Sequence, residues 1–169
     1  MLYVVAALVL LGLLCLMNLL LTAGILRRMR AQATATMGSG SLFALRPGSA
    51  VGEFAATTTE GEPLTAAAVD GTVAFFSADC PACHDTLPDF LAYARAQGRD
   101  RVLAVVGGDD ADTVRALAEV ARVVPAELDG GPVAAAFRNT WTPALYVVAD
   151  GRVVATAGRV HELTVPAGR

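Results

Sequence analysis

Two cysteines lie three positions apart near the middle of this 169-residue chain, in the segment Cys80-Pro81-Ala82-Cys83. At the first turn of a helix, cysteines at this spacing can close a small disulfide with little movement of the backbone. Cys80 would be the N-cap, where free amides and the helix dipole stabilise a thiolate. Pro81 suits the first helical position, because the N–H that it lacks would be unpaired there. The pattern predicts an exposed nucleophile at Cys80 and a resolving thiol at Cys83, with Pro81 and Ala82 as supporting residues.

Three other interpretations of this cysteine pair have to be weighed. The pair could be a structural disulfide, or it could supply half of a zinc site. Zinc needs two further ligands, and the only candidates are His161 and the poorly spaced His84. Residues 80–84 also match the attachment motif of a c-type haem, but β-rich sequence precedes them and no Met follows residue 37. We therefore expect no metal and no cofactor beyond a redox-active Cys80–Cys83 disulfide.

The elements that must position this motif are indicated by runs of apolar residues. Residues 72–77 form a short β-rich run that ends just before the first cysteine, and residues 85–97 have helical periodicity up to Gly98. Further strands are expected at 101–106, 123–128, 144–149 and 152–156, and further helices at 109–120 and 132–138. Asp150-Gly151 is a strong hairpin signal between the last two strands. This order predicts an α/β domain whose central sheet carries helices on both faces.

The N-terminus has the character of a membrane segment. No charged residue occurs from Leu2 to Leu26, and a helix of 25 residues is about 37 Å long, enough to cross a hydrocarbon core of about 30 Å. A cleaved signal peptide is the alternative, with a site near Ala31-Gln32-Ala33. However, a signal peptide has a shorter apolar region that follows basic residues. We predict a transmembrane anchor over 1–30, a flexible linker over 31–46 and one domain over 47–169.

The charge distribution limits the partners. Residues 1–47 carry four Arg and no acidic residue, whereas residues 48–169 carry nine Arg against sixteen acidic residues. An acidic main body argues against nucleic-acid binding, which draws its affinity from basic residues on phosphate. The chain contains no Lys, which excludes a lysine nucleophile and a phosphate-loop lysine. The acidic cluster at 109–112 is explained by a helix N-terminus without a metal.

The domain resembles the thioredoxin-fold disulfide oxidoreductases, in particular the membrane-anchored TlpA type that includes the MauD proteins. The likeness covers about residues 47–158. It rests on the opening segment 51–64, the strand and redox motif 75–83, Pro88 in the following helix, and Thr142-Pro143 before a strand. It implies a thioredoxin-like central mixed β-sheet flanked by helices. It also implies a cis bond before Pro143 and a substrate-binding role for Thr142 and Pro143, whose loop would pack against the redox motif.

Trp141, beside that loop, is the candidate for an exposed aromatic that docks the substrate, with a core aromatic as the alternative. The sequence departs from the family at three positions. Asp79 replaces a Trp that often precedes the first cysteine, Ala74 replaces a buried acid of thioredoxins, and Thr86 replaces a Glu that is frequent in TlpA-type proteins. The usual buried proton acceptor for the resolving thiol is therefore missing.

These observations predict a membrane-tethered thiol–disulfide oxidoreductase that reduces or exchanges disulfides in extracytoplasmic proteins. Its partners would be protein thiols or disulfides and an electron donor that lies in the membrane or outside the cytoplasm. The positive-inside rule would place Arg27, Arg28, Arg30 and the domain in the cytoplasm. The resemblance implies the opposite topology, which we follow, because long domains translocate despite local charge.

Two functions of other classes stay open at this stage. A thioredoxin-fold docking or assembly protein would keep the fold without catalysis. A peroxiredoxin-like peroxide reductase is suggested by Ser77-x-x-Cys80, which resembles the Thr-x-x-Cys motif of that group.

Overall fold

The computed structural model describes residues 1, 3–5, 10–15, 17 and 45–163. The chain divides into two compact units, residues 1–41 and residues 42–169, and the account below concerns the second. Most of the predicted anchor (1–30) and nearly all of the predicted linker (31–46) lie outside the described residues. Among the residues that are described, no helix is both long and apolar enough to cross a bilayer.

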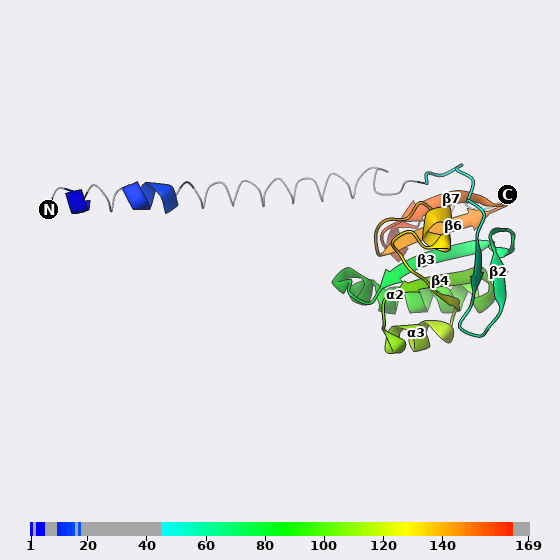
Figure 1. The fold of residues 1–169 in the computed structure, drawn as a ribbon. Coiled ribbons are helices and arrows are strands. Elements are labelled where there is room, and N and C mark those ends of the chain that lie inside the picture. The colour runs from blue at the N-terminus through cyan, green and yellow to red at the C-terminus, as the bar shows by residue number, and fades with distance from the viewer. Residues whose placement is uncertain (2, 6–9, 16, 18–44, 164–169) are drawn as a thin grey trace. The chain divides into compact units, whose positions relative to one another are not determined.

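A five-stranded mixed sheet forms the centre of the domain, with the strand order β5-β4-β3-β6-β7 (Figure 1). Strands β3, β4 and β5 are parallel, β6 runs antiparallel to β3, and β7 runs antiparallel to β6. The strands are β3 (Gly71–Ser77), β4 (Val102–Gly107), β5 (Arg122–Pro125), β6 (Ala144–Ala149) and β7 (Arg152–Ala157). In the register of the sheet, Phe75 in β3 lies between Val105 and Ala144. The predicted mixed central sheet is confirmed.

Helices cover both faces of the sheet, as predicted. Helices α2 (Pro81–Gln97) and α3 (Ala111–Ala118) pack on one face. The short α4 (Pro132–Ala136) packs on the other face with a hairpin of β1 (Ala55–Thr57) and β2 (Pro63–Thr65). Single 3-10 turns occur at η1 (Ala66–Ala68), η2 (Arg99–Arg101) and η3 (Val160–Glu162). Pro88 lies inside α2, where the resemblance implied a helix proline.

The alternation of side chains along β3 creates two separate cores. Val73 and Phe75 face α4, whereas Ala74 and Phe76 face α2. On the α4 side, the ring of Phe75 meets those of Phe137 and Tyr146 edge-on at centroid distances of 5.5 and 5.7 Å. On the α2 side, the ring of Phe76 packs against that of Phe90, with a distance of 5.0 Å between the ring centroids. The end of β3 that leads into the cysteine motif is therefore held firmly from both faces.

Three elements are shorter than the sequence predicted. Helix α4 ends at Ala136 rather than at residue 138, and Arg138 has a positive φ of 48°, outside the range of a right-handed helix. β5 ends at Pro125 rather than at residue 128, because the chain turns there and Leu128 lies over Gly107 at the end of β4. A Cβ at Gly107 would come within 2.4 Å of the Leu128 side chain, so the glycine makes room for this turn. Helix α3 begins after Asp110, which is its N-cap and accepts a hydrogen bond from the backbone amide of Thr113 at 3.0 Å.

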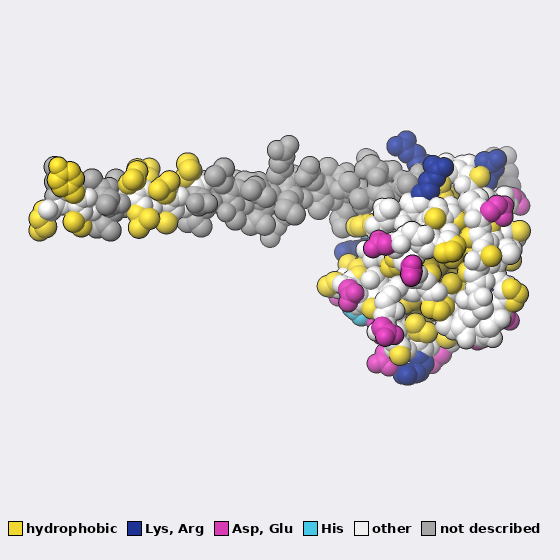
Figure 2. All heavy atoms as spheres, in the orientation of Figure 1, with side chains coloured by type: hydrophobic (Ala, Val, Ile, Leu, Met, Phe, Trp, Pro, Cys, Tyr) yellow, Lys and Arg dark blue, Asp and Glu magenta, His cyan; other side chains and the backbone are white. Residues whose placement is uncertain are grey.

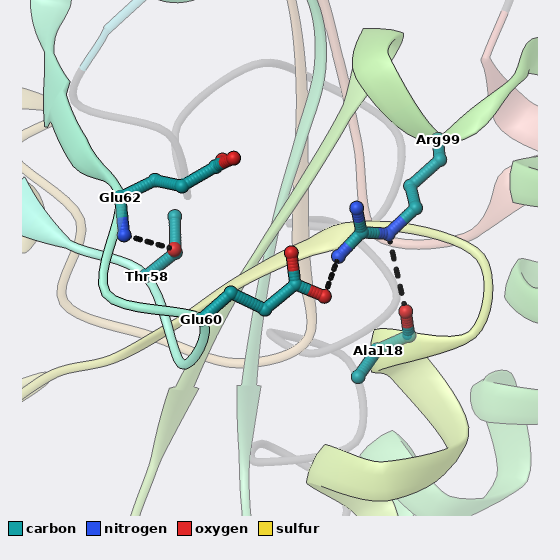
Figure 3. Close-up of polar contacts among 5 residues, drawn as sticks. All are labelled: Thr58, Glu60, Glu62, Arg99 and Ala118. Atoms are coloured by element: carbon teal, nitrogen blue, oxygen red, sulfur yellow. Dashed lines mark hydrogen bonds and ion pairs between the residues drawn. The ribbon is translucent and has the colours of Figure 1, made fainter.

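Both edges of the sheet are covered by segments from the start of the domain. At the β5 edge, Thr59 N donates to Val123 O at 2.8 Å. The same hairpin turn carries Glu60, which forms an ion pair with Arg99, while Arg99 Nε donates to the carbonyl of Ala118 at 3.2 Å (Figure 3). The arginine holds the pKa of Glu60 below its usual value. These contacts protect the β5 edge from pairing with other strands.

At the opposite edge, Ser49 O accepts from Val153 N at 2.9 Å, and Gly48 N donates to Val153 O at 2.7 Å. Leu45 is buried in the α4-side core, with 4% of its surface exposed. The packed part of the domain thus extends two residues upstream of the predicted start at residue 47.

Candidate functional site

Cys80 stands where β3 has ended and α2 begins. It is the N-cap of α2 in extended conformation, and Pro81 is the first helical residue, as the sequence predicted. The Cys83 amide donates to the sulfur of Cys80 at 3.2 Å. An amide hydrogen bond and the positive end of a helix dipole are the interactions that favour a negatively charged sulfur. The Cys80 side chain is partly exposed, so a second sulfur can reach it.

Cys83 lies one turn further along α2 and is buried, with 3% of its surface exposed. It belongs to the core on the α2 side of the sheet, together with Ala74. Burial is the main cause that raises the pKa of the Cys83 thiol, to about 12, and the hydrogen bond with Cys80 acts in the same direction. The structure describes both cysteines as thiols. The two chemically identical groups therefore differ sharply in access: Cys80 is partly exposed and Cys83 is buried.

The loop before β6 lies against the redox motif. The Thr142–Pro143 peptide bond is cis, which confirms the expectation from the sequence. Cys80 Sγ lies 3.5 Å from the carbonyl oxygen of Thr142, although 62 positions separate the two residues in the chain. Thr142 is partly exposed and Pro143 is buried. The structure thus brings together Cys80, Cys83, Thr142 and Pro143, four of the residues singled out from the sequence.

Trp141 combines features of both alternatives that the sequence left open. Its side chain is half-buried and packs against the core on the α4 side, yet it also lines a surface hollow beside the redox motif. Its indole Nε1 is buried and has no hydrogen-bond partner among the described residues. Buried donors without a partner are rare in native structures. The ring is therefore anchored in the domain and still reaches the surface next to Thr142.

Asn139 holds this loop in place, a role that the sequence analysis missed. The residue is buried, its Nδ2 donates to the carbonyl of Trp141 at 2.9 Å, and its Oδ1 accepts from the Tyr146 hydroxyl at 2.9 Å. Burial raises the pKa of Tyr146, so its hydroxyl keeps the proton that it donates. No signal in the sequence singles out Asn139, because its neighbours Arg138 and Thr140 are polar as well.

The acidic and basic residues beside the motif lie on its outer side. Asp79 and Asp85 are exposed, and His84 Nε2 lies 3.1 Å from the carbonyl oxygen of Ala78. His84 also contributes to a lowered pKa of Asp110, for which the hydrogen bonds from Thr113 are the main cause. No group of three or more His, Cys, Asp or Glu within the described ranges could hold a metal ion.

Ala74 and Thr86, two of the departures from the resemblance that the sequence indicated, supply no carboxylate to Cys83. Ala74 is fully buried in the same core as Cys83. Thr86 is buried as well, and its hydroxyl donates to the carbonyl of Ala82 at 2.8 Å. Besides burial, the main influences on the pKa of the Cys83 thiol come from Cys80, Ser77 and Thr142, none of which is a carboxylate.

A hollow of about 720 Å³ opens beside the redox motif, at the carboxyl ends of β3, β4 and β5. Asp79 and Thr142, which adjoin the motif, line it together with Glu127 and Asp129 from the segment after β5. Figure 2 shows several acidic side chains on the visible face of the folded domain, with the basic ones along its margins. We call this hollow the acidic groove.

Comparison with known proteins identifies the fold. The sequence matches no family model and no curated protein. The structure is similar to that of a thio-disulfide isomerase from Thermus thermophilus, at 26% identity and a TM-score of 0.51, over 68% of this chain and 88% of that one. It is also similar to the thioredoxin domain of a thiol-disulfide oxidoreductase from Bacteroides vulgatus, at 17% identity and a TM-score of 0.53, over 71% and 94% of the two chains. The chain has a thioredoxin-like α/β fold, and these structural neighbours are thiol–disulfide oxidoreductases.

Proposed function

We propose that this protein is a thiol–disulfide oxidoreductase whose redox-active group is the Cys80–Cys83 pair, without a further cofactor. One observation carries the proposal. The sulfur of Cys80 is partly exposed at a helix N-terminus, 3.2 Å from the Cys83 amide and 3.5 Å from the Thr142 carbonyl, while Cys83 is buried beneath it. An accessible nucleophile with a shielded second thiol is the arrangement that a two-step exchange reaction needs.

In the reducing direction, the Cys80 thiolate attacks one sulfur of a substrate disulfide. A bond forms between Cys80 and that sulfur as the substrate S–S bond breaks, and the other substrate sulfur leaves as a thiolate that takes a proton from solvent. The Cys83 thiolate then attacks Cys80 Sγ, closes the Cys80–Cys83 disulfide and releases the bound substrate sulfur. Two electrons pass to the substrate, and a donor dithiol returns them before the next cycle. In the oxidising direction the same steps run backwards.

The Thr142 backbone would position the substrate. Its carbonyl already faces the Cys80 sulfur, and an extended substrate segment could pair with the backbone of this residue. Such pairing would hold the substrate sulfur in line for attack by Cys80 and so lower the entropic part of the barrier. Trp141, next along the loop, would add apolar contact area.

We further propose that residues 1–30 anchor the protein as a single-pass protein of the cell membrane, with the redox domain on the extracytoplasmic side. The support is the uncharged segment from Leu2 to Leu26, which is long enough to span a bilayer as a helix. The partners would be protein thiols or disulfides outside the cytoplasm and an electron donor in or near the membrane. Structural disulfides form and require maintenance in that compartment.

Turnover of a disulfide protein tests the proposed function. The full-length protein in an uncharged detergent should catalyse the reduction of insulin by a dithiol, and Cys80→Ser should lose this turnover entirely. If Cys80→Ser keeps the wild-type rate, the pair is not the redox centre. A folded wild-type protein without turnover in either direction would support the docking protein instead.

A further inference from the structure

The acidic groove lies directly beside Cys80. Asp79, directly before Cys80, and Thr142, whose carbonyl is 3.5 Å from the Cys80 sulfur, both line it. The hollow is therefore adjacent to Cys80 and in reach of the residues that flank the cysteine of a polypeptide bound there. A second hollow of about 240 Å³ shares Pro125, Ala126 and Glu127 with the groove and continues along β1. The two adjoining hollows together are longer than one substrate side chain would fill.

The charge of the groove has one sign. Three of its lining residues, Asp79, Glu127 and Asp129, are exposed acids, and the lining contains no basic residue. No hydrogen bond or ion pair to another described side chain engages their carboxylates. Carboxylates of like charge around one concavity attract cations from solution and repel acidic ligands.

The remaining wall of the groove is apolar. Trp141 and Leu128, both half-buried, line it together with Pro125. The stems of lysine and arginine side chains pack along such surfaces while their charged ends reach polar groups. A cation near the face of a tryptophan ring gains a further attraction. The apolar wall can contact the stem of a long cationic side chain while the carboxylates attract its charged end. The groove therefore suits such a side chain better than an acidic or a small polar one.

We propose that the acidic groove is the substrate-recognition site for a lysine- or arginine-bearing segment next to the reactive disulfide of a protein substrate. This proposal rests on the proposed function and adds a substrate class to it. Asp79, Glu127 and Asp129 would bind the cationic side chains, and Trp141 would contact their stems. None of these four residues takes part in the exchange of electrons.

Binding can be measured without any redox step, because Trp141 is the only tryptophan of the chain. Two peptides of equal length, each with serine in place of its cysteines, carry either three lysines or three glutamates beside the central serine. With the full-length protein in an uncharged detergent at low salt, the lysine peptide should change the Trp141 fluorescence and the glutamate peptide should not. The change should weaken as salt rises towards 0.5 M, because the carboxylates are exposed and screened.

Turnover with the matching disulfide peptides supplies the second readout. The wild-type protein should reduce the lysine peptide with a kcat/KM about tenfold or more above that of the glutamate peptide. In the double variant Glu127→Gln/Asp129→Asn, that ratio should fall to about threefold or less. The control variant Asp89→Asn/Glu119→Gln removes two exposed acids that line neither hollow, and it should keep the wild-type ratio.

The outcomes separate the two proposals. Equal turnover of both peptides, or an unchanged ratio in the groove variant, overturns the groove as a recognition site and leaves the oxidoreductase intact. Binding of the lysine peptide without any turnover supports the groove and contradicts the proposed function. If the double variant does not fold, Asp129→Asn alone and the salt dependence of the wild-type ratio give the same decision.

Discussion

At the scale of single residues, the proposed chemistry depends on the difference between the two thiols. Cys80 is accessible at the helix N-cap, and Cys83 is buried with its pKa raised to about 12. A thiol reacts as its thiolate, so the buried cysteine is almost fully protonated at neutral pH. None of the main influences on its pKa is a carboxylate, so we expect the proton of Cys83 to leave to solvent or to the departing substrate. We therefore expect resolution of the mixed disulfide to be the slow step.

This difference predicts a steep pH dependence. Because the pKa of Cys83 is raised, its thiolate fraction grows about tenfold for each pH unit between 7 and 9, and the rate of resolution should grow by the same factor. Rapid-quench measurement of the mixed disulfide between Cys80 and a small peptide gives this rate directly. A rate that is flat from pH 6 to pH 9 would mean that another group in the protein accepts the proton.

A second residue-scale prediction concerns Asn139. Asn139→Ala removes both the donor to the Trp141 carbonyl and the acceptor of the Tyr146 hydroxyl, so we expect a loss of about 1–3 kcal/mol in the free energy of unfolding. Insulin reduction should slow as the Trp141–Thr142 loop loosens, whereas alkylation of Cys80 by iodoacetamide should change little. Urea unfolding, the rate of insulin reduction and the rate of Cys80 alkylation test this prediction.

Tyr146→Phe is the matched control, since it removes one of the two hydrogen bonds and should lower the free energy of unfolding by about 1 kcal/mol. If the Asn139→Ala variant unfolds at the same urea concentration as the wild-type protein, these two hydrogen bonds do not stabilise the loop.

At the scale of elements, hydrophobic runs predicted the five central strands because each is mostly buried and long enough to show a pattern. β3, β4, β6 and β7 begin and end within one residue of the predicted limits. β1 and β2 could not be predicted as strands, because three residues are too few for an alternation to be recognised. Only the resemblance pointed to that segment.

In the candidate site, too, some residues could be predicted from the sequence and others could not. The cysteines and Thr142-Pro143 could be found from sequence, because their residue types and spacing are rare by themselves. Asn139 and the acidic groove could not, since they depend on which loops the sheet brings together. Glu127 and Asp79 are 48 positions apart and look like ordinary surface acids until β3 and β5 place both at one hollow.

Gly71, at the start of β3, gives an element-scale prediction. Its φ of +129° is unfavourable for other residues, and a Cβ there would lie 2.1 Å from the carbonyl oxygen of Arg101. Gly71→Ala should therefore lower the free energy of unfolding by more than 1 kcal/mol. Gly61→Ala is the control, because Gly61 also has a positive φ, +83°, but nothing lies within 4 Å of its Cβ position. Urea denaturation of both variants measures the difference, and equal losses would show that the contact with Arg101 is not limiting.

At the scale of the whole molecule, an apolar N-terminal segment precedes an acidic domain in the sequence. If residues 1–30 form a membrane anchor with the domain outside, an alkaline phosphatase fused to the C-terminus should be active. A cytoplasmic reporter at the same position should be silent. The opposite pattern would place the domain in the cytoplasm, in agreement with the arginines that follow the apolar segment.

The central claim is that Cys80 attacks the substrate and Cys83 resolves the product. The most direct measurement is the trapping of covalent intermediates by the full-length variants Cys83→Ser and Cys80→Ser, each incubated with a disulfide-containing protein such as insulin. Mass spectrometry of non-reduced peptides then identifies the linked cysteine. The account predicts abundant mixed disulfides through Cys80 in Cys83→Ser and few or none in Cys80→Ser. Equal trapping by the two variants, or linkage mainly through Cys83, would contradict it.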